Sequence, residues 1–123
     1  MERPLSGRII LVIEDEPLIA LDIEQGLEAA GATTISARTV SAALLAIEEP
    51  NLSAAIVDHA LGDGDSSVLC HRLTERDIPF VTYTGYGDIE GACSAGAHVA
   101  KPANTSVLVS TVASLLAKRV IAN

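Results

Sequence analysis

Residues 8–17 read RIILVIEDEP, an apolar run that stops abruptly at three acids and a proline. The run Arg8–Ile13 has no polar break after its first residue, which is typical of a strand buried on both faces. Pro17 is a preferred residue for the first turn of a helix, so a helix is predicted to begin there. The stretch therefore predicts a strand followed by a helix, with Glu14 and Asp15 where the strand ends.

The rest of the chain repeats this alternation of strand and helix. Apolar spacing predicts a first helix that begins at Pro17 and is closed by Gly31. The later segment Asp88–Gly96 is too short and too rich in glycine for more than one or two irregular helical turns. Further strands are predicted over Thr33–Ala37, Ala54–Val57, Pro79–Tyr83 and Ala97–Ala100, further helices over Thr39 or Ser41 to Glu49, about Val68–Arg76 and after Asn104, and a loop over Gly62–Ser66. Alternation predicts a three-layer α/β/α sandwich around a five-stranded parallel sheet, with right-handed crossovers.

Composition excludes several classes of function. At 123 residues the chain is expected to be one domain, residues 1–123. Its net charge is −8 and its eight basic residues are scattered, which disfavours sequence-independent binding to DNA or RNA. Cys70 and Cys93 have no partners at metal-site spacing, no secretory signal is visible, and the apolar stretches are too short to span a membrane. We expect a soluble cytoplasmic protein with two free thiols.

Four apolar runs end on residues that can take part in phosphoryl chemistry: Glu14 and Asp15, then Asp58, then Thr84, then Lys101. Because the carboxyl ends of parallel strands lie side by side, we expect these side chains to share one crevice. Adjacent carboxylates suit a hard divalent ion such as Mg²⁺, and an aspartate can attack phosphorus to form an aspartyl phosphate.

Each of these residues also has a simpler interpretation. The acids can cap the following helix, and Asp58 can begin a turn. Thr84 can pack by its methyl group, and Lys101 can be an exposed surface lysine. Lys101 precedes Pro102, where a cis bond would turn the ammonium back over the strand ends. The ordered combination at strand ends favours the functional interpretation.

The matching pieces are Ile10–Pro17, Ala55–Asp58, Tyr83–Gly85 and Ala100–Pro102, and on these the chain resembles the receiver domain of two-component response regulators. The resemblance implies a flavodoxin-like sheet of strand order 2-1-3-4-5. It also implies that Glu14, Asp15, Asp58 and the main-chain carbonyl of Ala60 hold Mg²⁺, that Asp58 accepts phosphoryl, and that Thr84 and Lys101 sense it. The implied partners are a histidine kinase or phosphotransfer protein and a downstream effector protein.

The readout departs from the common pattern of that family. The aromatic switch residue of the fifth strand would fall at His98, which is polar and titratable, and whose simpler role is a half-buried hydrogen-bonded histidine. Thr84-Gly85-Tyr86 is similar to the motif of stand-alone receivers of alphaproteobacteria. We therefore treat Tyr86 and His98 as the two candidates for the switch.

Three classes of function compete at this stage. The leading hypothesis is a switch that is phosphorylated on Asp58 and changes partner affinity through the fourth helix, fifth strand and last helix, with a phosphate sink as a variant. The second is a receiver-like scaffold that is never phosphorylated. The third, a small-molecule phosphatase, lacks a general acid because Ala60 stands two residues after Asp58. We expect a signalling domain that gains and loses its own phosphoryl group, not a turnover enzyme.

Overall fold

A five-stranded parallel sheet forms the centre of the fold. The computed structural model describes residues 3–58, 60–61, 64–85, 91–101 and 103–122. The strands are β1 (Ile9–Ile13), β2 (Thr33–Ala37), β3 (Ala54–Asp58), β6 (Phe80–Thr84) and β7 (Ala97–Ala100). Their order β2-β1-β3-β6-β7 is the predicted 2-1-3-4-5 arrangement, and each bound lies within one residue of the prediction.

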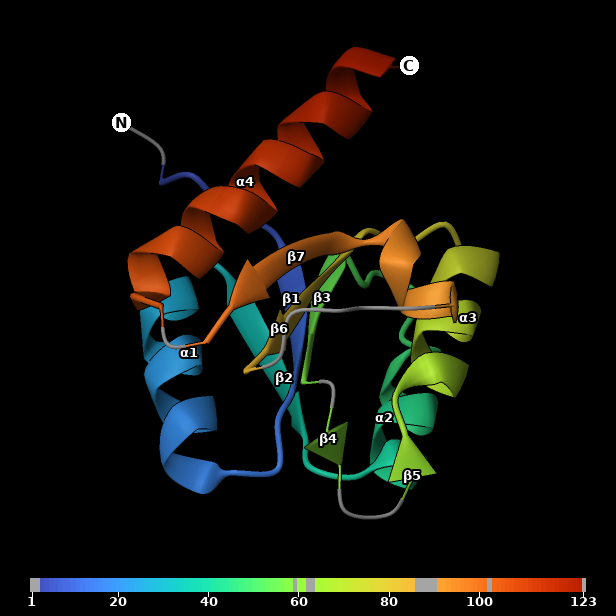
Figure 1. The fold of residues 1–123 in the computed structure, drawn as a ribbon. Coiled ribbons are helices and arrows are strands. Elements are labelled where there is room, and N and C mark those ends of the chain that lie inside the picture. Colours follow the sequence, from blue (N-terminus) through green and yellow to red (C-terminus); the bar gives the residue numbers. More distant parts are fainter. Residues whose placement is uncertain (1–2, 59, 62–63, 86–90, 102, 123) are drawn as a thin grey trace.

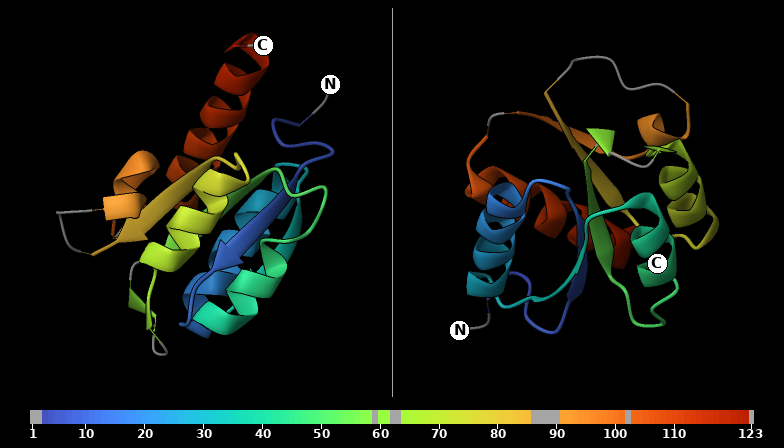
Figure 2. Two further views of the ribbon diagram at one scale, coloured as in Figure 1. Left: turned by 90° about the vertical axis from the view of Figure 1, so that its right-hand side faces the viewer. Right: turned by 90° about the horizontal axis from the view of Figure 1, so that it is seen from below.

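Helices cover both faces of the sheet, which confirms the three-layer prediction. The helices α1 (Pro17–Ala29) and α4 (Thr105–Ala122) lie on one face, and α2 (Val40–Ala46), α3 (Ser67–Glu75) and the 3₁₀ helix η1 (Gly91–Ala95) lie on the other (Figure 1). The view from below in Figure 2 shows the sheet between these two groups. The short η1 occupies the place where only irregular helical turns were predicted. Among the described residues, every helix is too short or too polar to cross a membrane.

Two apolar cores hold the layers together. Successive residues of β1 point to opposite faces, so Ile10 and Val12 pack toward α1 and α4, whereas Leu11 and Ile13 pack toward α2 and α3. All five residues of β3 and of β6 are buried. The central strands therefore form a firm support for the polar residues at their carboxyl ends.

The helix boundaries follow from their capping residues. Glu16 accepts a hydrogen bond from the main-chain N–H of Leu18 at the start of α1, and Gly31 follows the end of α1 with φ of 104°. Thr39 caps α2 by accepting from the N–H of Ala42 at 3.1 Å.

The second helix, α2, ends at Ala46, and the predicted end at Glu49 is wrong. The guanidinium of Arg76 donates hydrogen bonds to the main-chain carbonyls of Ile47 and Glu49. Those carbonyls lie in the turns that replace the last predicted turn of α2. A side chain from beyond α3 thus satisfies backbone groups that a longer helix would have paired within itself.

The segment after β3 contains a small hairpin where a loop over Gly62–Ser66 was predicted. Strands β4 (Ala60–Leu61) and β5 (Gly64–Asp65) pair antiparallel, and residues 59 and 62–63 lie outside the described part of the chain. The hairpin stands beyond the carboxyl edge of the sheet, at the bottom of Figure 1. The chain then enters α3, whose bounds differ by one residue from the prediction at each end.

The prediction of two free thiols is wrong, because Cys70 and Cys93 form a disulfide. Cys70 lies on α3 and Cys93 on η1, and their Cα atoms are 5.0 Å apart, within the range that a disulfide needs. The two residues are 23 positions apart in the sequence and meet only because η1 packs beside α3. A pairing of this kind follows from tertiary contact, which the spacing of the cysteines does not reveal.

Candidate functional site

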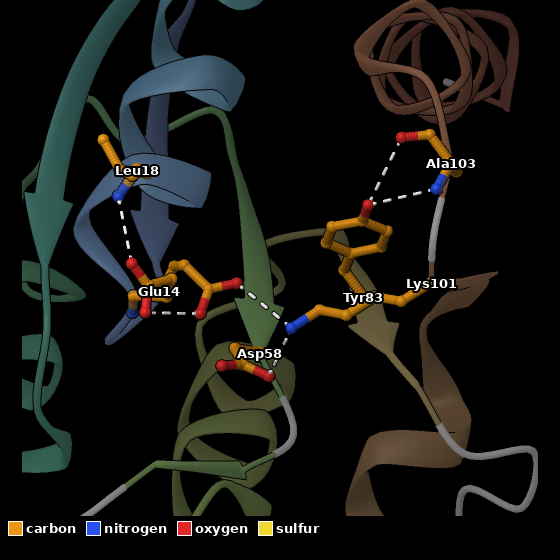
Figure 3. A network of polar contacts seen from close by, with 7 residues as sticks. Glu14, Leu18, Asp58, Tyr83, Lys101 and Ala103 are labelled. Carbon is orange, nitrogen blue, oxygen red and sulfur yellow. Dashed lines mark hydrogen bonds and ion pairs between the residues drawn. The ribbon is translucent and has the colours of Figure 1, made fainter.

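Three charged side chains from three different strand ends meet at the carboxyl edge of the sheet. The ammonium nitrogen Nζ of Lys101 lies 3.3 Å from Oε1 of Glu14 and 3.3 Å from Oδ1 of Asp58 (Figure 3). Glu14 follows β1 and Asp58 ends the neighbouring β3, whereas Lys101 follows β7 at the edge of the sheet. The long lysine side chain reaches across β6 to complete the cluster, as predicted from the strand ends.

Burial makes these charges depend on one another. Only 2% of Glu14 and 5% of Asp58 is exposed, and a buried carboxylate is costly unless it is paired. Burial, reinforced by the hydrogen bond and charge of Asp58, raises the pKa of Glu14 to about 7. Although burial lowers the pKa of Lys101, the charges of Asp58 and Glu14 outweigh that effect and raise it. The single ammonium of Lys101 thus faces two carboxyl groups. When both carboxyl groups are ionised, a second cation would be needed to balance their charge.

The acids after β1 divide between the two roles that the sequence left open. Glu16 caps α1, and its own main-chain N–H donates to Oε2 of Glu14 at 3.3 Å. The Glu14 side chain points toward the ammonium of Lys101, and the neighbouring Asp15 is exposed (Figure 3). The carboxylate oxygens of Glu14, Asp15 and Asp58 lie within 4.8 Å of one another.

A hard divalent ion fits this set of donors. Mg²⁺ prefers oxygen ligands, takes one or two carboxylates and keeps several waters, and the exposed Asp15 leaves one side of the cluster open to solvent. Ionised carboxylates this close would repel one another without a cation, and the charge of Asp58 adds to burial in raising the pKa of Glu14. Ala60, the predicted carbonyl ligand, lies on β4 two residues beyond Asp58, and its role as a ligand stays a prediction.

Tyr83 supports Lys101 and was not singled out from the sequence. The Nζ atom of Lys101 lies 5.3 Å from the centroid of the Tyr83 ring. The Tyr83 hydroxyl accepts from the N–H of Ala103 at 3.2 Å and donates to the carbonyl of Ala103 at 3.3 Å (Figure 3). The N–H of Lys101 also donates to the carbonyl of Thr84 at 2.8 Å. Pro102, on which the prediction of a cis bond depends, lies outside the described residues.

The residues predicted to read out the site lie on β6, on β7 and between them. Thr84 ends β6 and is 3% exposed. His98 is exposed on β7, and its Nδ1 lies 3.3 Å from Oγ1 of the buried Thr82, whose hydroxyl also donates to the carbonyl of Ala97. Thr82 was not predicted as a partner of His98. Tyr86, the other switch candidate, falls outside the described residues.

Comparison with known proteins finds relatives by sequence and by structure. No protein-family model matches the chain. The photosynthetic apparatus regulatory protein RegA of Rhodobacter capsulatus is 31% identical over 92% of the chain. The solution structure of SdrG from Sphingomonas melonis Fr1 is 34% identical, with a TM-score of 0.76 over 89% of this chain and 96% of that one. The chain spans 64% of RegA and 42% of PhyR from Methylorubrum extorquens, the curated relatives that it matches.

A further solved structure shows the chemistry of a similar protein. It is a response regulator protein from Burkholderia pseudomallei, 26% identical, with a TM-score of 0.75 over 94% of this chain and 75% of that one. That protein was crystallised with a phosphorylated aspartic acid, a calcium ion and citrate.

Proposed function

The chain belongs to the receiver domain family of response regulators, and from this premise we propose that it is a phosphoacceptor switch with Asp58 as the phosphorylated residue. The family is one of signalling proteins, not of turnover enzymes. The observation that carries the proposal is the position of Asp58, a buried carboxylate at the end of a central strand with the Lys101 ammonium 3.3 Å away. The proposal treats residues 1–123 as one receiver unit.

The group transfer needs a nucleophile and a way to disperse negative charge. An oxygen of Asp58 attacks the phosphorus of a phosphohistidine on a histidine kinase or phosphotransfer protein, and the P–N bond breaks with its electron pair returning to the imidazole. The product is an acyl phosphate on Asp58. Lys101 then pairs with a phosphoryl oxygen, because its ammonium already lies within 3.3 Å of the attacking carboxylate.

Glu14, Asp15, Asp58 and the carbonyl of Ala60 are the residues that would hold Mg²⁺. When bound, the ion neutralises charge on the transferring phosphoryl group. The cluster of carboxylate oxygens within 4.8 Å supports this assignment, as does the calcium ion in the Burkholderia protein. Asp15, which is exposed, and Glu14, which is buried, would each supply a carboxylate ligand to the ion.

Phosphorylation is proposed to change a surface made by η1, β7 and α4. Thr84 ends β6 and is in register with Ala100 of β7. From this position at the strand ends, its hydroxyl is proposed to respond to the phosphoryl group. His98, tethered to Thr82, and Tyr86 are the proposed switch residues. The partner that reads this surface is proposed to be a separate effector protein.

The test is incubation of the full chain with a small phosphoryl donor and Mg²⁺, followed by intact-mass measurement and a phosphate-affinity gel. We expect one phosphoryl group on the wild type and none on Asp58→Asn, with a linkage that base and hydroxylamine cleave, as they cleave an acyl phosphate. Asp22→Asn is the matched control, because it makes the same change at an exposed aspartate of α1. An unmodified wild type, with both a small donor and a cognate kinase, would favour a scaffold that acts without phosphorylation.

A further inference from the structure

The disulfide joins the two chain segments that leave the candidate site. After Asp58 the chain passes through the β4–β5 hairpin into α3, which carries Cys70. After Thr84 it continues to η1, which carries Cys93. The covalent bond between them therefore ties the segment downstream of the proposed phosphoacceptor to the segment downstream of the proposed sensor.

The surroundings of Cys93 suit a thiol as well as a disulfide. Its Sγ lies 3.6 Å from the main-chain carbonyl of Ser66 and 3.8 Å from the Ser66 hydroxyl. A reduced Cys93 would donate its S–H to that carbonyl, so reduction leaves no buried polar group without a partner there. Ser66 is itself fully buried and directly precedes α3. A reduced thiol at Cys93 thus has a hydrogen-bond partner at the start of α3.

The fold does not depend on this bond for its core. Two apolar clusters fill both faces of the sheet, and a chain of 123 residues is well above the size at which disulfides are usually needed. The element that the bond restrains is η1, a 3₁₀ helix of five residues, and helices of this type have weaker hydrogen-bond geometry than α-helices. The bond therefore acts mainly on η1, which belongs to the surface proposed to respond to phosphorylation.

We propose that Cys70 and Cys93 form a reversible thiol–disulfide site whose oxidation holds η1 against α3 and opposes the response to phosphorylation of Asp58. Oxidation forms the Sγ–Sγ bond, and the two protons and two electrons pass to a low-molecular-weight disulfide such as glutathione disulfide, which is cleaved to two thiols. Cys70 is 0% and Cys93 is 1% exposed, so the exchange requires η1 to separate from α3. This inference rests on the proposed function.

Coupling between two sites is reciprocal, which gives the proposal a sharp test. If the bond opposes the phosphorylated arrangement, then a phosphoryl group on Asp58 must disfavour the bond by the same factor. We expect the equilibrium constant for disulfide formation in glutathione buffers to fall by about fivefold or more when Asp58 carries beryllium fluoride, a stable phosphoryl analogue, with Mg²⁺. The fraction of disulfide is measured on the full chain by thiol alkylation and mass spectrometry.

Two variants complete the experiment. Asp58→Asn should show the same disulfide equilibrium with and without beryllium fluoride. Cys70→Ala with Cys93→Ala, which keeps small apolar side chains in the buried site, should take phosphoryl at one rate in oxidising and reducing buffers, whereas the wild type should be slower when oxidised.

The outcomes separate this inference from the proposed function. A wild type that is phosphorylated on Asp58 but shows an unchanged disulfide equilibrium overturns the inference alone. A disulfide that glutathione exchanges only after the chain unfolds does the same. Absence of phosphoryl transfer in both oxidation states overturns the proposed function, and the coupling falls with it.

Discussion

The hydroxyl of Tyr83 bridges both main-chain polar groups of Ala103, accepting from its N–H at 3.2 Å and donating to its carbonyl at 3.3 Å. Ala103 follows Lys101 by two residues, so this bridge fixes the chain just beyond the lysine. The same tyrosine places its ring centroid 5.3 Å from the lysine ammonium. One side chain of β6 thus positions both the backbone and the charge of the segment between β7 and α4.

Replacing Tyr83 by Phe removes the bridge and keeps the ring. We expect the free energy of unfolding in urea to fall by about 1–2 kcal/mol, because two hydrogen bonds of a part-buried backbone are lost. The pKa of the Lys101 ammonium should stay raised, since Glu14 and Asp58 remain in place.

A second variant, Tyr83→Leu, removes the ring as well and should destabilise the protein further. Superimposable unfolding curves for wild type and Tyr83→Phe would show that the bridge makes no net contribution.

Glu14 predicts a pH dependence of stability that runs against the usual direction for an acid. Burial and the neighbouring Asp58 raise its pKa to about 7 in the folded chain, against 4.5 as its ordinary value. Between these values the folded state holds a proton that the unfolded state has released, so stability falls as the pH rises from 4.5 to 7. The expected slope is about 1.4 kcal/mol per pH unit.

This slope is measured by urea unfolding in EDTA at several pH values, as the difference between wild type and Glu14→Gln. The amide does not titrate, so Glu14→Gln should lack this slope. Glu28→Gln is the matched control, because it makes the same change at an exposed glutamate of α1. Parallel pH profiles for wild type and Glu14→Gln would contradict the prediction.

Mg²⁺ should stabilise the folded chain by offsetting the repulsion among the clustered carboxylates of Glu14, Asp15 and Asp58. At a concentration about 100-fold above its Kd, the ion should stabilise the folded chain by about 2.7 kcal/mol, measured by thermal or urea unfolding. Asp15→Asn should weaken this stabilisation while leaving the metal-free stability nearly unchanged, because Asp15 is exposed. Glu75→Gln, on α3 and outside the cluster, should respond to Mg²⁺ as the wild type does. Equal stabilisation of Asp15→Asn and wild type would remove Asp15 from the set of ligands.

Lys101→Met removes the cation between two buried carboxyl groups. The pKa of Glu14 should then rise above 7, because the lysine charge opposes the effects of burial and Asp58. We expect a loss of about 1–2 kcal/mol at pH 8 in EDTA, less than for a fully buried ion pair since 24% of the lysine side chain is exposed. At pH 5 the loss should be smaller, because a protonated Glu14 no longer needs the cation. An equal loss at both pH values would show that the lysine acts by packing alone.

The sheet and the meeting of its strand ends were predictable because both follow from local patterns. Unbroken apolar runs identify strands buried on two faces, and the parallel arrangement brings their carboxyl ends together whatever fills the crossovers. The contact of Lys101 with Asp58, 43 positions apart, is a consequence of topology of this kind. The end of α2 was not predictable, because Arg76 binds the carbonyls of Ile47 and Glu49 from 29 and 27 positions away.

Other parts of the structure depend on contacts between residues far apart in the chain, which no local sequence pattern predicts. Tyr83 reads as an apolar strand residue, and its partner is a main-chain group 20 positions later that any residue except proline could supply. Cys70 and Cys93 are adjacent only because η1 packs against α3. For the tyrosine, one clue was available: a buried hydroxyl needs a hydrogen-bond partner, so a tyrosine within a buried strand indicates a nearby polar contact.

Gly26 of α1 gives a prediction about how the helices on one face meet. A Cβ added at Gly26 would collide with the methyl carbon Cγ2 of Thr105, the first residue of α4. The Thr105 hydroxyl donates a hydrogen bond to Asp22 at 2.9 Å, and this bond holds the methyl group toward α1. Alanine favours a helix over glycine by about 1 kcal/mol, but overpacking costs about 1–3 kcal/mol. Gly26→Ala should therefore be neutral to about 2 kcal/mol destabilising in the wild-type chain.

With Thr105→Ser, which keeps the hydroxyl and removes the methyl, the same substitution at Gly26 should stabilise the chain by up to about 1 kcal/mol. Urea unfolding of the four chains of this double-mutant cycle measures the difference, and additive effects would mean that α1 and α4 do not meet at this pair.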